Sequence, residues 1–336
     1  MLKKRILQTL TIGVVLSGCV AVKERKSFGS VERIDPSLNA LINESATIEV
    51  LDSGYGWTEG PVWIEAQKML LFSDVEKNTI YKWTEQKGTE EYLKPSGFTG
   101  SEDYPTQEPG SNGLSLDNEG RLILCQHGDR RVARLDAPFD KPQPVFTTLA
   151  DNFRGKKLNS PNDLVFRSNG DLFFTDPPYG MPGRENDSVY RQLPFHGVYK
   201  VTKDGTVSLL VDSISRPNGI ALAPDEKTLI VANSDPAKPV WYTFELTDSD
   251  SLINARISFD TRTIEGAGDG LPDGLKIDRQ GNVFASGPGG IWIFGPDGKL
   301  IGRILIPALT ANCALADDDK TLFITSDTYL LRLKMR

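Results

Sequence analysis

The chain has 336 residues, of which 39% are hydrophobic and 25% are charged, and it contains 31 Gly and 21 Pro. This composition excludes a disordered polymer and favours a turn-rich, all-β protein. Its 38 basic side chains are outnumbered by 45 acidic ones, and no long basic run follows the first residues, so we expect no nucleic-acid partner.

The first 18 residues have the organisation of an export signal. Basic residues at 3–5 precede an apolar stretch at 6–15 that is too short to span a bilayer, and Leu-Ser-Gly-Cys follows, with its Cys at position 19. This order resembles the signal of a bacterial lipoprotein, which implies cleavage before Cys19 and acylation of its thiol. The alternative is an ordinary secretory signal with a chance Cys.

This signal sets the expected domains and location. We expect a lipoprotein signal peptide at 1–18, a tether at 19–45, which is polar and contains Pro36, and a folded domain at 46–336. Acyl chains would attach the mature chain to a membrane without any transmembrane helix. Val20 after the Cys indicates, by resemblance to enterobacterial sorting rules, a cell-envelope lipoprotein of the outer membrane that faces the periplasm.

Six copies of one sequence pattern fill the rest of the chain. Each copy has a small or turn residue, then Asn, Asp or Glu, then an apolar strand, a turn and a second apolar strand. The key residues of the copies are Glu59, Asn112, Asn162, Asn218, Asp273 and Asn312. Repeats of roughly 40 to 55 residues with about four strands each are typical of β-propeller blades. The sequence therefore predicts a six-bladed β-propeller.

The last copy leaves room for only three strands before the C-terminus. We expect a strand at 46–51 to supply the missing outer strand, so that the N- and C-terminal strands pair and close the ring.

Propeller geometry would bring the key residues together. The first strand of each blade lies innermost, so the starts of the six first strands should meet at one mouth of the central channel. Three long segments, 97–110, 151–160 and 177–195, open on the same face. Long loops gathered at one end of a rigid ring indicate the working surface.

The converging side chains are carboxylates and carboxamides. This oxygen-only set suits a hard divalent cation, and calcium most of all. The alternative is that these residues cap blade-entry turns, and for Asn112 and Asn312 it is at least equally good. It is weaker for Glu59, Asn162, Asn218 and Asp273, because Glu is a poor turn residue and buried carboxylates need a cation or a donor to offset their desolvation.

Four motifs, TEGPVW, SPNDLVF, RPNGIAL and LPDGLKID, occur in an order and spacing that resemble the gluconolactonase family. That family also contains senescence marker protein, luciferin-regenerating enzyme and relatives of diisopropyl-fluorophosphatase. The resemblance covers almost the whole mature chain. It implies a six-bladed propeller, a divalent cation at the channel centre, and hydrolysis of lactones or related esters. Animal members carry Arg where this chain has Ser160, so sugar-acid contacts through that Arg do not transfer.

The resemblance also implies roles for individual residues. The positions that match the family's metal site are Glu59, Asn162, Asn218 and Asp273. Asp273 also matches the proposed acid/base catalyst. For a small-molecule lactone or sugar-acid substrate we expect contacts from Asn112, Asn162 and His127. A packing role on a loop is the alternative for His127.

The predicted function is metal-dependent lactone hydrolysis of the gluconolactonase type. Calcium would polarise the carbonyl while a carboxylate activates water. The alternatives are hydrolysis of organophosphates or other esters at the same site, and a non-catalytic binding propeller in which the cation only makes the channel rigid. The carboxylate pair favours an enzyme.

Overall fold

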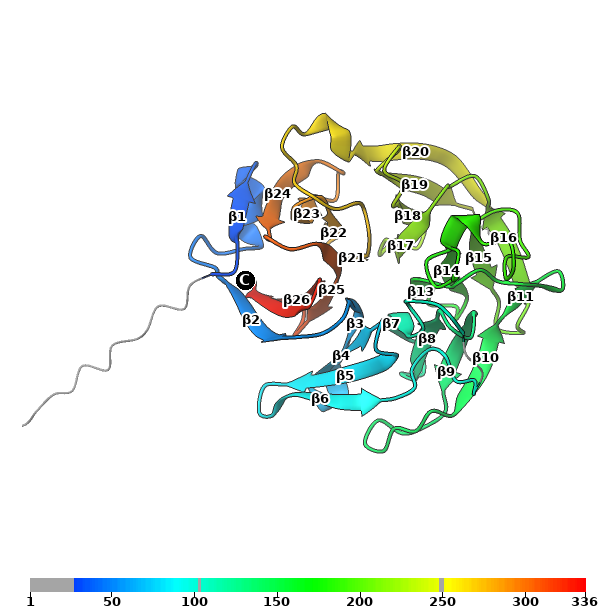
Figure 1. Ribbon diagram of the computed structural model, residues 1–336. Helices are drawn as coiled ribbons and strands as arrows, with labels where there is room; N and C mark the ends of the chain where they lie inside the picture. The colour runs from blue at the N-terminus through cyan, green and yellow to red at the C-terminus, as the bar shows by residue number, and fades with distance from the viewer. Residues whose placement is uncertain (1–26, 102–103, 248–250) are drawn as a thin grey trace, which may run out of the picture.

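The structure is a computed structural model that describes residues 27–101, 104–247 and 251–336 (Figure 1). Its six large sheets surround a central channel, so the chain is an all-β, six-bladed propeller, as predicted. The predicted signal peptide and Cys19 lie outside the described residues. Within the described part of the chain, no helix has both the length and the apolar character needed to cross a membrane.

Four blades consist of four antiparallel strands that follow each other along the chain from the channel outward. Blade 1 contains β3 (Thr58–Ile64), β4 (Met69–Asp74), β5 (Thr79–Thr84) and β6 (Gly88–Leu93). Blade 2 contains β7 (Ser111–Leu116), β8 (Leu122–Gln126), β9 (Arg131–Leu135) and β10 (Phe146–Ala150). Blade 3 contains β13 (Leu164–Phe166), β14 (Leu172–Asp176), β15 (Gly197–Val201) and β16 (Val207–Val211). Blade 4 contains β17 (Pro217–Leu222), β18 (Thr228–Asn233), β19 (Val240–Leu246) and β20 (Leu252–Asp260).

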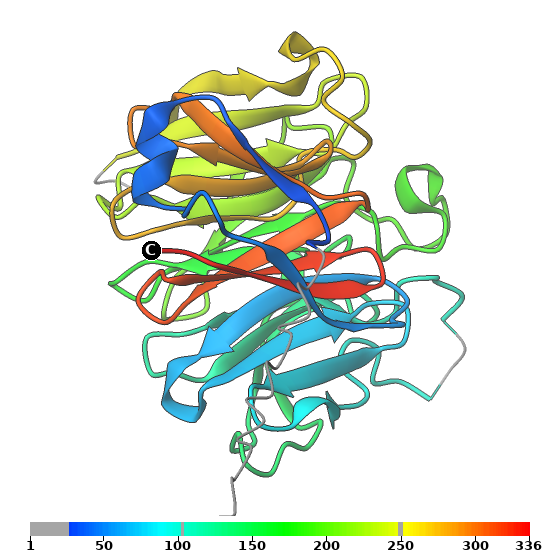
Figure 2. The ribbon, with the colours of Figure 1, turned by 90° about the vertical axis from the view of Figure 1, so that its left-hand side faces the viewer.

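The other two blades combine strands from both ends of the described chain. Blade 5 contains β21 (Leu275–Ile277), β22 (Val283–Gly287), β23 (Gly290–Phe294), β24 (Leu300–Leu305) and, outermost, β1 (Ser30–Arg33). Blade 6 contains β25 (Thr310–Ala316), β26 (Thr321–Ser326), β27 (Tyr329–Lys334) and, outermost, β2 (Ile48–Ser53). Figure 2 shows β2 beside the red C-terminal strands, and Ile48 is paired with Leu333. The predicted closure of the ring is therefore confirmed.

The remaining elements are short. A small hairpin between blades 2 and 3 is formed by β11 (Asn152–Phe153) and β12 (Lys156–Lys157). The 3-10 helices are η1 (Pro36–Ala40), η2 (Glu65–Gln67), η3 (Arg184–Asn186) and η4 (Thr261–Thr263).

The structure corrects the predicted tether for residues 30–42. β1 pairs with β24, and Leu38 and Ile42 are fully buried against the side chains of blades 5 and 6. Pro36 begins η1 rather than a linker, because its fixed φ suits a first helical position. The sequence feature that could have indicated this packing is the pair of apolar residues Leu38 and Ile42, four positions apart, because a flexible linker does not need apolar residues.

The second strand of each blade fixes the position of the neighbouring first strand. Every residue of β4, β14 and β22 is buried, because these strands lie between two other blades. Ser73 Oγ donates to Asn112 O at 2.9 Å, and Thr175 Oγ1 donates to Asn218 O at 2.6 Å. These bonds hold the first strands at fixed positions around the channel.

Candidate functional site

The first strands approach each other at the mouth of the channel. Gly113 N donates to Asn162 O at 2.7 Å, and Gly274 N donates to Ala311 O at 2.8 Å. A Cβ atom on Gly274 would lie 2.0 Å from Asn312 Cγ, so no other residue fits there without displacing the Asn312 side chain of the neighbouring blade. The Asp273-Gly274 pair therefore serves the contact between blades and is more than a turn.

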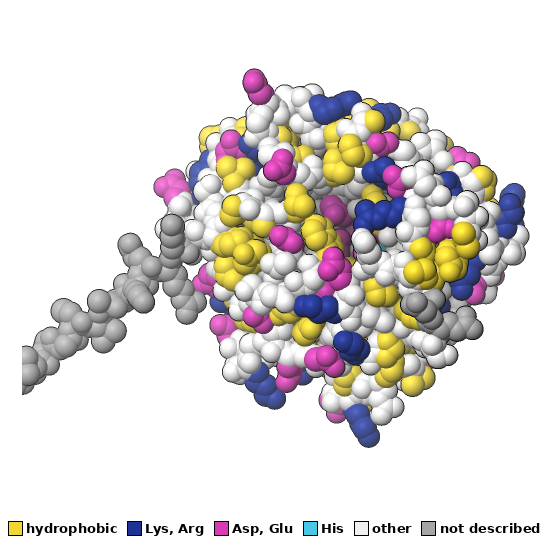
Figure 3. Space-filling view, in the orientation of Figure 1, with side chains coloured by type: hydrophobic (Ala, Val, Ile, Leu, Met, Phe, Trp, Pro, Cys, Tyr) yellow, Lys and Arg dark blue, Asp and Glu magenta, His cyan; other side chains and the backbone are white. Residues whose placement is uncertain are grey.

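The key residues of the six repeats are buried around this mouth. The exposed fraction is 5% or less for Glu59, Asn112, Asn162, Asn218 and Asn312. Asp273 is half-buried, but its Oδ1 atom is shielded from solvent. Figure 3 shows a hollow near the middle of this face with acidic side chains inside it.

Glu59 and Asp273 are close enough to influence each other's ionisation. Burial raises the pKa of Glu59 to about 7, and the negative charge of Asp163 adds to the effect. Burial, followed by the charges of Glu59 and Asp163, raises the pKa of Asp273 well above its ordinary value. Glu59 Oε2 accepts hydrogen bonds from Gly60 N at 2.9 Å and Asn312 Nδ2 at 3.4 Å. Asp273 Oδ1 has no hydrogen-bond partner among the described residues.

Two charged residues of the site were not identified from the sequence. Asp163 is 1% exposed, and Lys276 places its Nζ 3.7 Å from Asp163 Oδ2 and 3.3 Å from Asn312 Oδ1. Strand alternation gave no guide to Asp163, because it precedes β13. Lys276 could have been noticed in the sequence, because it is a charged residue inside the short apolar strand β21.

The donor atoms of the site fit a hard divalent cation. Glu59 and Asp273 supply carboxylate oxygens, while Asn112 Oδ1 and Asp273 Oδ1 are buried with no hydrogen-bond partner among the described residues. No three His, Cys, Asp or Glu side chains of residues 27–101, 104–247 and 251–336 are grouped so that they could hold a metal ion. Two carboxylates with carboxamide oxygens form an oxygen-only donor set of the kind that hard divalent cations prefer.

His127 lies beneath the loop at 177–195. Its side chain is fully buried, and Nδ1 is 3.5 Å from Glu108 Oε2. A Cβ atom on Gly180 would lie 2.4 Å from His127 Cβ, so this part of the loop packs directly on the histidine. Neither ring nitrogen has a hydrogen-bond partner among the described residues.

Two of the predicted surface loops are joined over the mouth. Arg184 of the loop at 177–195 forms an ion pair of 2.8 Å with Glu108 of the segment at 97–110. Ser160 Oγ donates to Pro177 O at 2.6 Å and accepts from Gly180 N at 3.0 Å. Ser160 thus anchors the loop.

Tyr179 brings a hydroxyl from this loop toward the site. Burial raises the pKa of its phenol, and the negative charge of Asp273 adds to the effect. Its hydroxyl makes no hydrogen bond within the described part of the chain. Tyr179 can therefore donate a hydrogen bond to a bound molecule.

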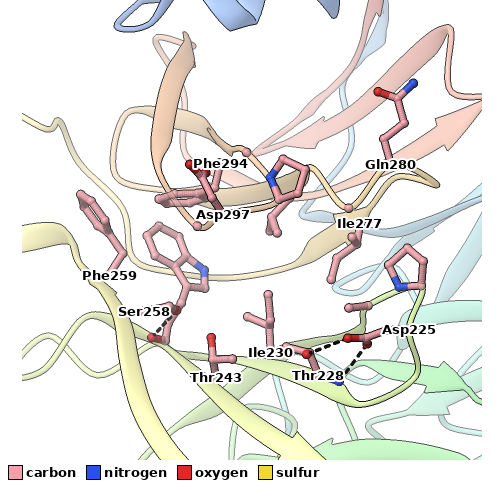
Figure 4. A pocket seen from close by; sticks show the side chains of 18 of the residues that line it. Asp225, Thr228, Ile230, Thr243, Ser258, Phe259, Ile277, Gln280, Phe294 and Asp297 are labelled. Carbon is pink, nitrogen blue, oxygen red and sulfur yellow. Dashed lines mark hydrogen bonds between the residues drawn. The ribbon is translucent and has the colours of Figure 1, made fainter.

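A separate cavity of about 360 Å³ lies between blades 4 and 5 (Figure 4). Phe259 and Phe294 form part of its wall, and Asp225 and Asp297 lie in turns at its edge. None of the six key residues lines this cavity. The side chains at the channel mouth, and not the size of a cavity, therefore identify the candidate site.

Comparison with known proteins gives a consistent result. The model of the SMP-30/Gluconolactonase/LRE-like region matches residues 57–328. A gluconolactonase of Zymomonas mobilis is 39% identical over 318 residues, which cover 92% of this chain and 87% of the relative. Lactonase drp35 of Staphylococcus aureus is 28% identical over 254 residues, which cover 73% of this chain and 68% of the relative. The solved structure of XC5397 from Xanthomonas campestris, a gluconolactonase, has 30% identity and a TM-score of 0.78 and covers 91% of this chain and 95% of its own.

Proposed function

This chain belongs to the SMP-30/gluconolactonase/LRE-like family, and we propose that it is a hydrolase that opens small polar lactones at the channel mouth. The observation that carries the proposal is the pair of Glu59 and Asp273 at the channel mouth, two carboxylates with pKa values raised by burial and by negative neighbours, with Asp273 Oδ1 shielded from solvent and unpaired among the described residues. Relatives named gluconolactonase and lactonase support the reaction class.

The site is proposed to bind a divalent cation, and calcium fits its donors best. Glu59, Asn162, Asn218 and Asp273 would hold the cation through oxygen atoms. When bound, the cation would supply positive charge that stabilises the negative charge developing on the lactone carbonyl oxygen.

Asp273 is proposed as the catalytic base. Its burial and its negative neighbours make the carboxylate a stronger base than one in water. Asp273 takes a proton from water as the water oxygen bonds to the carbonyl carbon. The proton then passes to the ring oxygen as the ester C–O bond breaks, which leaves a hydroxy acid. We propose that Asn112, Asn162 and Tyr179 bind substrate hydroxyls and that Glu59 remains a cation ligand.

Activity and cation binding test this proposal together. Aldonolactones, aryl esters and phosphotriesters are assayed with and without a chelator, using the wild-type protein, Glu59→Gln, Asp273→Asn and the exposed control Glu119→Gln. We expect lactone turnover that chelation abolishes, and a loss of about 10²-fold or more in kcat for Asp273→Asn. Both site variants should bind calcium at least about tenfold more weakly by titration calorimetry and keep the wild-type circular dichroism spectrum.

Specific results would contradict separate parts of the proposal. Unchanged calcium affinity in both site variants rules out the cation assignment. Preferred turnover of phosphotriesters or aryl esters would change the proposed substrate class and leave the proposed site unchanged. No turnover of any panel member, with calcium still bound, favours a binding propeller.

We also propose that the mature protein is a cell-envelope lipoprotein anchored through Cys19. The support is the order of basic residues, apolar stretch and Leu-Ser-Gly-Cys at the start of the chain.

A further inference from the structure

A positive charge is built into the channel beside the carboxylates. Lys276 Nζ lies 3.7 Å from Asp163 Oδ2 and donates to Asn312 Oδ1 at 3.3 Å and to Leu275 O at 3.1 Å. Lys276 belongs to blade 5, whereas Asp163 directly precedes the first strand of blade 3 and Asn312 lies in that of blade 6. The ammonium group therefore connects three parts of the ring across the channel.

Asn312 links this charge to Glu59. Its Oδ1 faces Lys276, and its Nδ2 donates to Glu59 Oε2 at 3.4 Å. An amide has one acceptor side and one donor side, so the ammonium and the carboxylate fix its orientation together. Asn312 is 1% exposed, so this link lies where solvent screens charges weakly.

The charges in the channel can be counted. Glu59, Asp163 and Asp273 are three acidic side chains of the channel: the charge of Asp163 raises the pKa of Glu59, and the charges of Glu59 and Asp163 raise the pKa of Asp273. Lys276 is the ammonium beside them. Glu108 also acts on this group, but Arg184 pairs with it at 2.8 Å. With all three carboxylates ionised, two negative charges remain uncompensated.

We infer that Lys276 is a positioning residue that sets the charge of the cation site. Its positive charge compensates Asp163, so the two negative charges that remain match the charge of a divalent ion. The inference rests on the proposed function. Lys276 thereby disfavours a trivalent ion and keeps divalent affinity below the level that three free carboxylates would give. A lysine with a purely structural role predicts the reverse, because its removal would loosen the site and weaken binding.

The test measures cation affinity in full-length variants. Calcium and terbium(III) are titrated calorimetrically into chelator-treated wild-type protein and Lys276→Met. We expect Lys276→Met to bind calcium about tenfold more tightly or better, with a larger gain for terbium, because the effect scales with the charge of the ion. The control is Lys82→Met, which removes a surface ammonium that pairs with Glu90 and should leave both affinities unchanged.

A double variant that restores the net charge distinguishes an effect of charge from an effect of the shape of the site. Asp163→Asn alone should weaken calcium binding about tenfold, because one negative charge remains. Asp163→Asn combined with Lys276→Met again leaves two uncompensated negative charges and should return calcium affinity to within about threefold of wild type. Lys276→Arg keeps the charge and should also stay near wild type. If Lys276→Met melts at a much lower temperature than the wild-type protein, the calcium affinity of Asp163→Asn alone tests the inference.

Failure of the inference is distinguishable from failure of the proposed function. If wild-type protein shows neither calcium binding nor chelator-sensitive activity, the proposed function fails. If wild-type protein binds calcium while Lys276→Met binds it equally or more weakly, the inference is overturned. A double variant that binds more weakly than both single variants also overturns it.

Discussion

At the scale of single residues, ionisation of Glu59 should couple the stability of the propeller to pH. Its carboxyl has an ordinary pKa of 4.5, and burial raises the pKa to about 7 in the folded protein. Between these pH values the folded chain holds a proton that the unfolded chain has released, so the free energy of unfolding decreases as pH rises. Asp273 acts in the same direction. We expect the Tm of chelated protein to fall between about pH 5 and pH 7.5 in scanning calorimetry.

Two controls accompany this pH profile. Added calcium should reduce the slope, because the bound ion compensates the ionised carboxylates. Glu59→Gln should reduce it as well, because that side chain no longer titrates. A chelated wild-type protein whose Tm rises or stays level across this range would contradict the prediction.

His127 gives a second prediction at the residue scale. His127→Ala should lower the free energy of unfolding by about 2 kcal/mol or more, because it leaves a cavity under the loop that covers the imidazole. Its kcat should stay within a few-fold of wild type. Urea denaturation and lactone kinetics on one preparation measure both quantities. A kcat loss of about 10²- to 10⁴-fold with calcium still bound would make His127 the proton-transfer group and leave Asp273 a ligand only.

The sequence revealed some side chains of the site and not others, for a physical reason. Glu59 and Asp273 stood out because each occupies the same position in a repeated motif. Asp163 and Lys276 lie inside the repeats at positions where the other copies carry no charge, and their proximity depends on how three blades meet across the channel. Such contacts are tertiary and leave no local periodicity in the chain.

At the scale of elements, one hydroxyl anchors the start of the loop at 177–195. Ser160→Ala removes the bonds to Pro177 O and Gly180 N, each worth about 1 kcal/mol. We expect faster proteolytic cleavage within the loop and an increase in KM, with little change in kcat, because the catalytic carboxylates do not depend on these bonds. The matched control is Ser168→Ala, whose hydroxyl binds Glu226 at an exposed turn. Cleavage and KM at wild-type values would contradict the anchoring role.

Elements followed from the sequence wherever the repeat was present. All six first strands were predictable, because apolar alternation and turn residues recur in each copy, and β2 was predictable because the last copy lacks a fourth strand. β1 was not predictable, because it stands outside the repeat and pairs with β24, far away in the sequence. Its placement depends on burial of Leu38 and Ile42 rather than on strand propensity.

At the scale of the whole molecule, the location of the protein can be tested independently of its chemistry. Cys19→Ala should move the protein from the membrane fraction to the soluble fraction, because no acyl chain can be attached. Fractionation and mass spectrometry of the mature N-terminus measure this. A soluble wild-type protein with an unmodified N-terminus would contradict the anchor. The folded propeller and its lactone activity should be the same in both forms.

The pairing of β2 with β27 has a consequence for biogenesis. β2 is made before blades 1 to 4, and its partner β27 is made after them. A contact between such distant segments closes a large loop and is slow to form. Blade 6 therefore stays open until β27 has been made, and the unpaired edge of β2 is exposed during that interval. A chain that lacks β27 would present an aggregation-prone edge, so the same pairing that closes the ring distinguishes chains with a finished blade 6 from chains without one.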